Sequence, residues 1–126
     1  MPALKSSPEF EALEGALSPD RWTTPRLALQ LSPAPAERVI RAVITNPHHS
    51  TAYLRNRVRV AIEGRTVFDD ILFAGRGVSV EHLAPAKAPV LIEVESQATL
   101  SPDAIDGRSR GVFLDLIQSA ALQPAS

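Results

Sequence analysis

The sequence predicts an all-β fold, an antiparallel β-sandwich of seven or eight strands that is jelly-roll-like and has a short N-terminal helix. Three observations support this. Apolar and polar residues alternate with a period of two along most of the chain, Gly, Pro and Asn clusters separate the alternating runs, and no run at helical spacing lies between them. Alternating strands without crossover helices are typical of sandwiches and barrels.

The 126 residues are enough for one hydrophobic core. The hydrophobic share of 44% and the charged share of 21% are ordinary for a folded domain, despite 11 prolines. The expected organisation is an extension with a short helix, the sandwich itself and a tail, which cover residues 1–19, 20–118 and 119–126 respectively.

The expected helix lies in the N-terminal extension. Pro8 stands at a first-turn position after two serines, and Phe10, Leu13 and Leu17 recur at helical spacing. Gly15 and the polar residues after it would end the helix.

The first expected strands follow Pro25. Leu27, Leu29 and Leu31 alternate with polar or small residues, as on a half-buried strand. Residues 38–45 are apolar on both sides, so this strand should be largely buried. The turn-forming run from Asn46 to Ser50 separates it from the next strand.

The middle of the chain predicts a β-hairpin over residues 56–68. Val58, Val60 and Ile62 alternate with charged and small residues, and Glu63-Gly64-Arg65 reads as a tight turn. Three further strands are expected at residues 78–80, 90–95 and 111–118. The last of these could also be a helix, because Phe113, Leu116, Ile117 and Ala120 would line one helical face, but the alternation favours a strand.

The charge balance excludes two classes of partner. Thirteen basic and fourteen acidic residues give a net charge of -1, which leaves no excess to neutralise nucleic-acid phosphates or an anionic membrane. Arg55, Arg57 and Arg59 do form a short basic row on one face of a strand. The simplest interpretation is that they are the solvated side of that strand.

The chain has no cysteine, so disulfides, thiolate metal sites and cysteine nucleophiles are not expected. The first seventeen residues lack the continuous apolar core of a secretory signal, and no stretch reaches the length of a membrane span. We therefore expect a cytoplasmic protein, or a fragment or mature form that lacks its targeting sequence.

The histidines do not predict a metal site. His48 and His49 are adjacent, so on extended backbone their side chains point to opposite faces, and His82 is distant in sequence. No metal and no other cofactor is expected.

The carboxylate pairs do not predict an enzyme. A glycosidase would use one pair among Asp69 and Asp70, Glu93 and Glu95, or Asp103 and Asp106. Such sites lie in clefts lined by aromatic rings, and this chain has one Trp, one Tyr and four Phe. A glycine-rich phosphate loop and a nucleophile elbow are also absent from the sequence. No catalytic residue is assigned.

One segment near the C-terminus carries a family resemblance. Residues 101–114, SPDAIDGRSRGVFL, contain Asp106, Arg108, Gly111 and Val112 in the spacing Asp-x-Arg-x-Leu-Gly-Val, with Arg110 at the usual leucine position. This segment resembles the ending of small β-sandwich domains found beside bacterial glycosyltransferases and other polysaccharide-biosynthesis enzymes.

Two earlier segments extend the resemblance. Residues 20–27, DRWTTPRL, look like the start of those domains, and residues 60–65, VAIEGR, look like their central hairpin. The resemblance implies a jelly-roll-like, carbohydrate-associated module whose partner is a bacterial polysaccharide or a glycosyltransferase-like protein.

Structural roles are expected for three residues. Asp106 can accept hydrogen bonds from turn amides or pair with Arg108, with sugar contact as the alternative. Gly111 would allow close backbone approach, and Trp22 would be a half-buried core anchor.

The candidate ligand-binding residues are loop side chains at one end of the sandwich, where aromatic stacking and planar hydrogen bonds could hold a sugar. They are Tyr53, His48, His49, Arg108 and Arg110. Tyr53 is the preferred stacking ring because it follows the polar His-His turn.

The leading functional hypothesis is a non-catalytic module that binds a bacterial polysaccharide or supports its biosynthesis. The alternative is a protein-interaction or assembly domain that would join a larger complex or form an oligomer, with no sugar ligand. Arg110 in place of leucine and the apolar run of residues 71–73 would fit such an interface. A sugar binder should expose Tyr53 in an end-loop groove, whereas an assembly domain should show a contiguous apolar patch.

Overall fold

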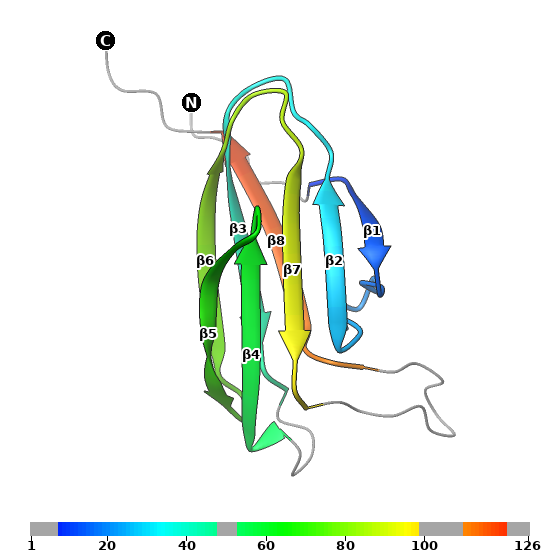
Figure 1. Cartoon of the computed structure of the whole chain (residues 1–126), viewed down its shortest axis with the longest axis vertical. Coiled ribbons are helices and arrows are strands. Elements are labelled where there is room, and N and C mark those ends of the chain that lie inside the picture. The colour runs from blue at the N-terminus through cyan, green and yellow to red at the C-terminus, as the bar shows by residue number, and fades with distance from the viewer. Residues whose placement is uncertain (1–7, 48–52, 99–109, 121–126) are drawn as a thin grey trace.

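The computed structural model describes residues 8–47, 53–98 and 110–120, which form eight strands in two antiparallel sheets (Figure 1). The five-stranded sheet has the order β1-β2-β7-β4-β5, and the three-stranded sheet has the order β6-β3-β8. The strands are β1 (Phe10–Glu14), β2 (Arg26–Leu31), β3 (Arg38–Thr45), β4 (Arg55–Ile62), β5 (Arg65–Phe73), β6 (Gly77–Ala84), β7 (Val90–Ser96) and β8 (Phe113–Ala120).

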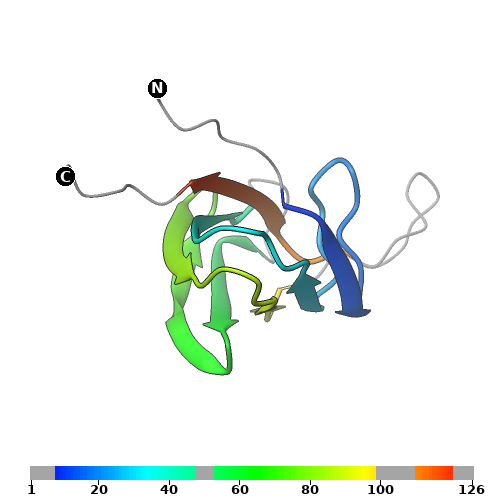
Figure 2. The same ribbon diagram turned by 90° about the horizontal axis from the view of Figure 1, so that it is seen from above.

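The strand pairs are nested along the chain. β4 pairs with β5, β3 with β6 and β2 with β7, so each pair encloses the one before it. Pairing of β3 with β8 and of β4 with β7 then joins these pairs into the two sheets. This nesting is the winding of a jelly roll, except that β1 pairs with β2 in the larger sheet. Viewed from above, β1 lies beside β2 at one end of that sheet (Figure 2).

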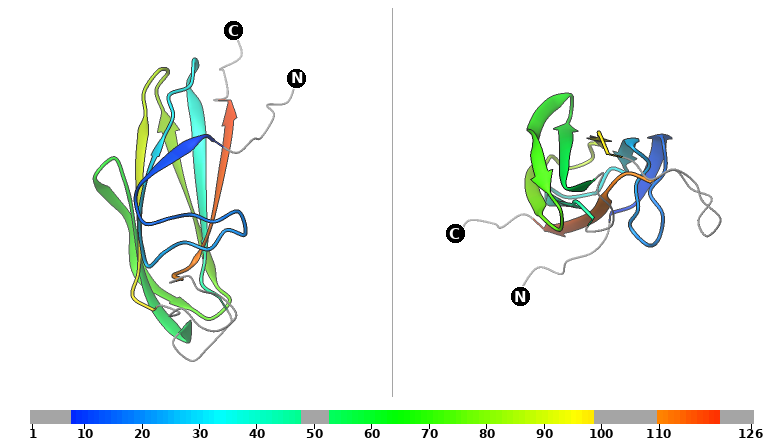
Figure 3. Two further views of the ribbon diagram at one scale, coloured as in Figure 1. Left: turned by 90° about the vertical axis from the view of Figure 1, so that its right-hand side faces the viewer. Right: turned by 90° about the horizontal axis from the view of Figure 1, so that it is seen from below.

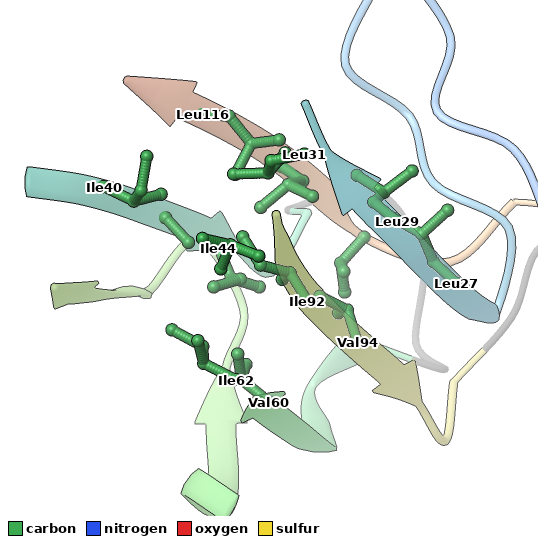
Figure 4. Close-up of a cluster of buried hydrophobic side chains, with 14 of the residues drawn as sticks. Leu27, Leu29, Leu31, Ile40, Ile44, Val60, Ile62, Ile92, Val94 and Leu116 are labelled. Atoms are coloured by element: carbon green, nitrogen blue, oxygen red, sulfur yellow. The ribbon is translucent and has the colours of Figure 1, made fainter. Parts of the chain in front are cut away.

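The core lies between the two sheets, and the twofold alternation of the sequence fills it. In the five-stranded sheet, Leu29 stands opposite Ile92 and Ile92 opposite Ile62, and all three are buried. Ile40 and Ile44 of β3 supply buried side chains from the other sheet (Figure 4). Each such side chain stabilises the fold by about 1.5–3 kcal/mol relative to remaining exposed.

The β4–β5 hairpin turns at Glu63 and Gly64, which have positive φ angles of 54° and 78°. Two consecutive left-handed residues are the geometry of a type I′ turn, whose twist matches that of the flanking strands. The prediction of a hairpin here is confirmed. β5 is longer than predicted and continues to Phe73, and the turn of this hairpin leans away from the sandwich (Figure 3).

The predicted N-terminal helix is wrong, because Phe10–Glu14 is the strand β1. A single short helix is marginal in water, whereas the edge of β2 offers backbone partners along the whole segment. Phe10 stands opposite Leu31 and Ala12 opposite Leu29, so apolar residues of β1 share the core side with those of β2. Gly15 follows with a φ of 72°, where a Cβ atom would collide with Thr24.

The C-terminal segment, for which strand and helix were both considered, is a strand. β8 pairs with β3 over eight positions, from Phe113 opposite Thr45 to Ala120 opposite Arg38. Leu114 and Leu116 point into the core. In the described part of the chain, no helix is long and apolar enough to cross a membrane.

Candidate binding face

Tyr53, the predicted stacking ring, is buried with 0% of its surface exposed. Its hydroxyl donates a hydrogen bond of 2.6 Å to the carbonyl oxygen of Gly111. Burial raises the pKa of the phenol to about 12, and the nearby charge of Arg110 acts in the opposite direction. A ring enclosed in this way cannot stack on a ligand, so the role predicted for Tyr53 is corrected from ligand contact to packing.

A buried polar network lies next to Tyr53. The Asn46 side-chain amide donates to the carbonyl oxygens of Tyr53 and Leu72, at 2.8 and 3.0 Å. The Asn56 amide donates to Asn46 Oδ1 at 3.1 Å and to Ser96 Oγ at 3.0 Å. This network ties β4 and β7 to the segment after β3, and it satisfies polar groups that would otherwise destabilise the interior.

The sequence contains a signal for this network. Asn56 has the same parity as Val58 and Val60, so it occupies a core-facing position of an alternating strand. A buried asparagine needs partners of matching geometry, and such a position therefore predicts a network.

Arg110, the second predicted ligand residue that the structure describes, is also buried, with 6% exposed. Its guanidinium carbon lies 5.7 Å from the centroid of the half-buried Trp22 ring. The Trp22 and Phe113 rings pack with centroids 4.2 Å apart. Arg110 is thus part of an internal cation–π contact rather than of an accessible site, which corrects its predicted role.

Gly111 lies where the chain approaches the start of β2. A Cβ atom at this position would come within 2.9 Å of the Thr24 carbonyl oxygen and 3.0 Å of Pro25 Cα. The other predicted site residues, which are His48, His49, Asp106 and Arg108, lie outside the described residues.

The structure instead brings polar side chains together on the outer face of the five-stranded sheet. The register places four charged residues in one row across four strands, in the order β2, β7, β4 and β5. These residues are Arg26, Glu95, Arg59 and Asp69. We call this row, together with Arg57, the outer polar face.

Two ion pairs lie on the outer polar face. Arg57 Nε lies 2.9 Å from Asp69 Oδ1, and Arg26 Nη2 lies 3.4 Å from Glu95 Oε1. The Arg57–Asp69 hydrogen bond raises the pKa of Arg57 and lowers that of Asp69, so both groups remain charged. Arg59 donates from Nε and Nη2 to Thr66 Oγ1, at 3.3 and 3.0 Å.

A hollow of about 410 Å³ opens on this face. Besides the five residues of the outer polar face, Ser96 and Gln97 line it. Beyond Asp69, the outward-facing residues of β5 are apolar. Ile71 stands opposite Arg57, and Phe73 stands opposite Arg55 with 55% of its surface exposed. The Arg55 guanidinium carbon is 6.0 Å from the centroid of the Phe73 ring.

The hollow contains hydrogen-bonding groups of both charges. A glycosidase needs one carboxyl group with a raised pKa, whereas the pKa of Asp69 is lowered and Glu95 is ion-paired. Within the described ranges, no group of three or more His, Asp or Glu side chains could hold a metal ion. The face is therefore suited to binding neutral polar groups by paired donors and acceptors.

Comparison with known proteins gave matches to solved structures. No family model matches the sequence, and no curated protein sequence matches it. A family 35 carbohydrate-binding module from Clostridium thermocellum aligns at 10% identity and a TM-score of 0.46, covering 93% of this chain and 90% of that one. A family 35 module from Paenibacillus barcinonensis aligns at 9% identity and a TM-score of 0.45, covering 95% and 93%.

An acetyl xylan esterase from Butyrivibrio proteoclasticus also aligns, at 9% identity and a TM-score of 0.41. That alignment covers 100% of this chain but 34% of the esterase chain. At these scores and identities, the chain is similar to these structures in a general way only, and the similarity says nothing about its ligand.

Proposed function

We propose that this protein is a non-catalytic carbohydrate-binding module and that it binds through the outer polar face. The observation that carries the proposal is the hollow itself, where guanidinium and carboxylate groups from four strands lie in one register row. Planar charged groups of both signs suit sugar hydroxyls, because each hydroxyl can both donate and accept a hydrogen bond.

The position of the face on the sheet supports binding. Its side chains stand on central and edge strands rather than on loops, and Arg26 and Arg57 each pair with a carboxylate on the neighbouring strand. Groups that are already oriented lose less conformational entropy on binding. Phe73 adds an exposed aromatic ring on the same side of β5.

The resemblance near the C-terminus favours a bacterial polysaccharide as the ligand and a glycosyltransferase-like protein as the partner. The part of that motif before Arg110 lies outside the described residues. Both the polysaccharide class and the partner therefore stay predictions from sequence.

A glycan array tests the proposal, with bacterial capsular polysaccharides and exopolysaccharides printed beside plant glycans. Arg57→Ala should reduce the signal at least tenfold, because it removes a donor from the hollow and releases Asp69. The matched control is Arg41→Ala. Arg41 also pairs with a carboxylate on the neighbouring strand, Glu81 at 2.8 Å, but on the three-stranded sheet.

The outcome is decisive in either direction. Binding of one glycan class that Arg57→Ala loses and Arg41→Ala keeps would support the outer polar face as the site. Equal loss in both variants, or retention in both, would place any glycan site elsewhere.

Exposed apolar residues on β5 favour a second candidate function, that of an assembly domain. Val67, Ile71 and Phe73 are 41%, 39% and 55% exposed on a strand that pairs on one side with β4. Exposed apolar edge strands are typical sites of protein pairing. Light scattering would show a concentration-dependent dimer if this function holds and a monomer at all concentrations if it does not.

A further inference from the structure

We infer that the ligand is an extended saccharide chain that lies along β4 and β5, with one part on Phe73 and another in the hollow at Arg59 and Asp69. This inference rests on the proposed function and names the kind of carbohydrate. It distinguishes recognition of the interior of a chain from recognition of a single sugar or a chain end.

The register of the hairpin aligns the outward-facing residues of β4 and β5. On the outer side, Arg55 stands opposite Phe73, Arg57 opposite Ile71, and Arg59 opposite Asp69. These pairs are successive same-side positions of two antiparallel strands. The distance from Phe73 to Asp69 along β5 is therefore about 14 Å, at about 3.4 Å per residue.

The two ends of this track differ in their chemistry. At one end Phe73 offers an exposed ring, and the Arg55 guanidinium, at 6.0 Å, stands at the outer limit of a cation–π contact. At the other end are charged groups that can hydrogen-bond hydroxyls. A sugar ring that stacks on Phe73 is too short to reach Asp69, so one ligand can use both ends only if it contains several linked rings.

The track connects these ends. Ile71 lies between Phe73 and Asp69 on β5, with 39% of its surface exposed, and Arg57 lies beside it on β4. The surface between the ends thus offers an apolar contact and a donor. In the described part of the chain, no strand lies beyond β5 in this sheet, so a long chain can pass over the edge.

The experiment uses the full chain and the polysaccharide that the array retains, cut by partial hydrolysis into oligosaccharides of increasing length. Calorimetric titration should show that affinity rises at least about tenfold from the monosaccharide to oligomers long enough to cover the track. Phe73→Ala should abolish this rise, so that the longest oligomers lose far more affinity than the monosaccharide does. Arg59→Ala should weaken binding at every length.

Leu83→Ala is the matched control for Phe73→Ala. Leu83 is 56% exposed, almost the same fraction as Phe73, and it lies on the outer side of β6 in the other sheet. This control should keep the full dependence of affinity on length. Circular dichroism of each variant verifies that the strands are intact.

Each remaining outcome overturns the inference. If the array retains a glycan but the monosaccharide binds as tightly as the longest oligomer, the proposed function stands and the extended ligand is wrong. If Phe73→Ala weakens all lengths equally, Phe73 belongs to the same subsite as Arg59 and no track exists. If no glycan is retained, the proposed function fails and the inference fails with it.

Discussion

Two polar regions of this protein use similar chemistry in opposite ways. The network around Asn46, Asn56 and Ser96 is buried, and its hydrogen bonds end on other groups of the chain. The outer polar face is open to solvent, and its ion pairs leave room for a ligand in the hollow beside them.

The difference shows where stability and function reside. Removing a partner from a buried network leaves the other polar atoms with neither a protein partner nor water to bond to, which destabilises the fold. Exposed ion pairs contribute little to stability, because water solvates the separated charges well. We therefore expect variants of the network to change folding, and variants of the outer polar face to change binding alone.

The largest expected effect is on folding and comes from Asn56→Ala. This change removes the acceptor of the Ala98 N–H, at 2.8 Å, and the donor to Ser96 Oγ. The free energy of unfolding should fall by about 3 kcal/mol, the usual cost of breaking a buried network. Urea denaturation followed by the fluorescence of the single tryptophan measures it.

Arg57→Ala is the comparison for that measurement. It removes an exposed ion pair and should leave the urea midpoint where it is in the unmodified protein. A loss of less than about 1 kcal/mol for Asn56→Ala would remove the distinction between the two regions.

An intermediate effect is expected from the ionisation of Tyr53. The folded pKa of about 12 lies above the ordinary 10.0, so the protonated phenol stabilises the fold fully below pH 10. This contribution should disappear as the pH rises toward 12. Tyr53 is the only tyrosine, so phenolate absorbance in the ultraviolet follows this group alone.

Tyr53→Phe tests the same hydroxyl by removing it. It should cost about 1 kcal/mol near neutral pH, since it removes the bond to Gly111, and it should flatten the alkaline loss of stability. A native titration at the ordinary pKa of 10.0 would mean that the ring is accessible to water.

The smallest expected effect on stability comes from Asp69. The Arg57 hydrogen bond lowers its pKa below 3.8, so the carboxylate and any contribution of the pair persist above 3.8 and are lost as the pH falls through the lowered value. Glycan binding should therefore hold through mildly acidic pH and then decline. Asp69→Asn should leave urea stability unchanged. If glycan binding declines at the same acidic pH in Asp69→Asn as in the unmodified protein, Asp69 does not belong to the site.

The sequence was sufficient for the strands with one buried side, because burial on one side imposes alternation. Leu27, Leu29 and Leu31 are all buried, and side chains at every second position share one face only when the segment is an extended strand. β1 could not be predicted in this way, since its spacing also suits a helix. The conformation of β1 is decided only by a tertiary feature, the free edge of β2 with which it pairs.

The site could be predicted less well than the fold. Arg57 was recognised as part of a solvated basic row, but its partner Asp69 comes from β5 and the Glu95 opposite Arg59 comes from β7, and only the register shows that they meet. Tyr53 follows a polar turn, and the sequence gives no indication that its ring enters the interior. Predicting a site formed by cross-strand neighbours requires the pairing of the strands.

The nested winding of the strands also imposes an order on folding. The β4–β5 hairpin needs closure of a two-residue turn only, whereas β2 and β7 come from distant parts of the chain and their pairing requires a large loop to close. Arg57 and Asp69 can thus come together early, Glu95 joins them when β7 pairs with β4, and Arg26 joins only when the outermost pair, β2 with β7, forms. We expect the complete face to exist only in the folded protein, in which all four of its strands are paired. A ligand of this face would therefore bind and stabilise the native state selectively.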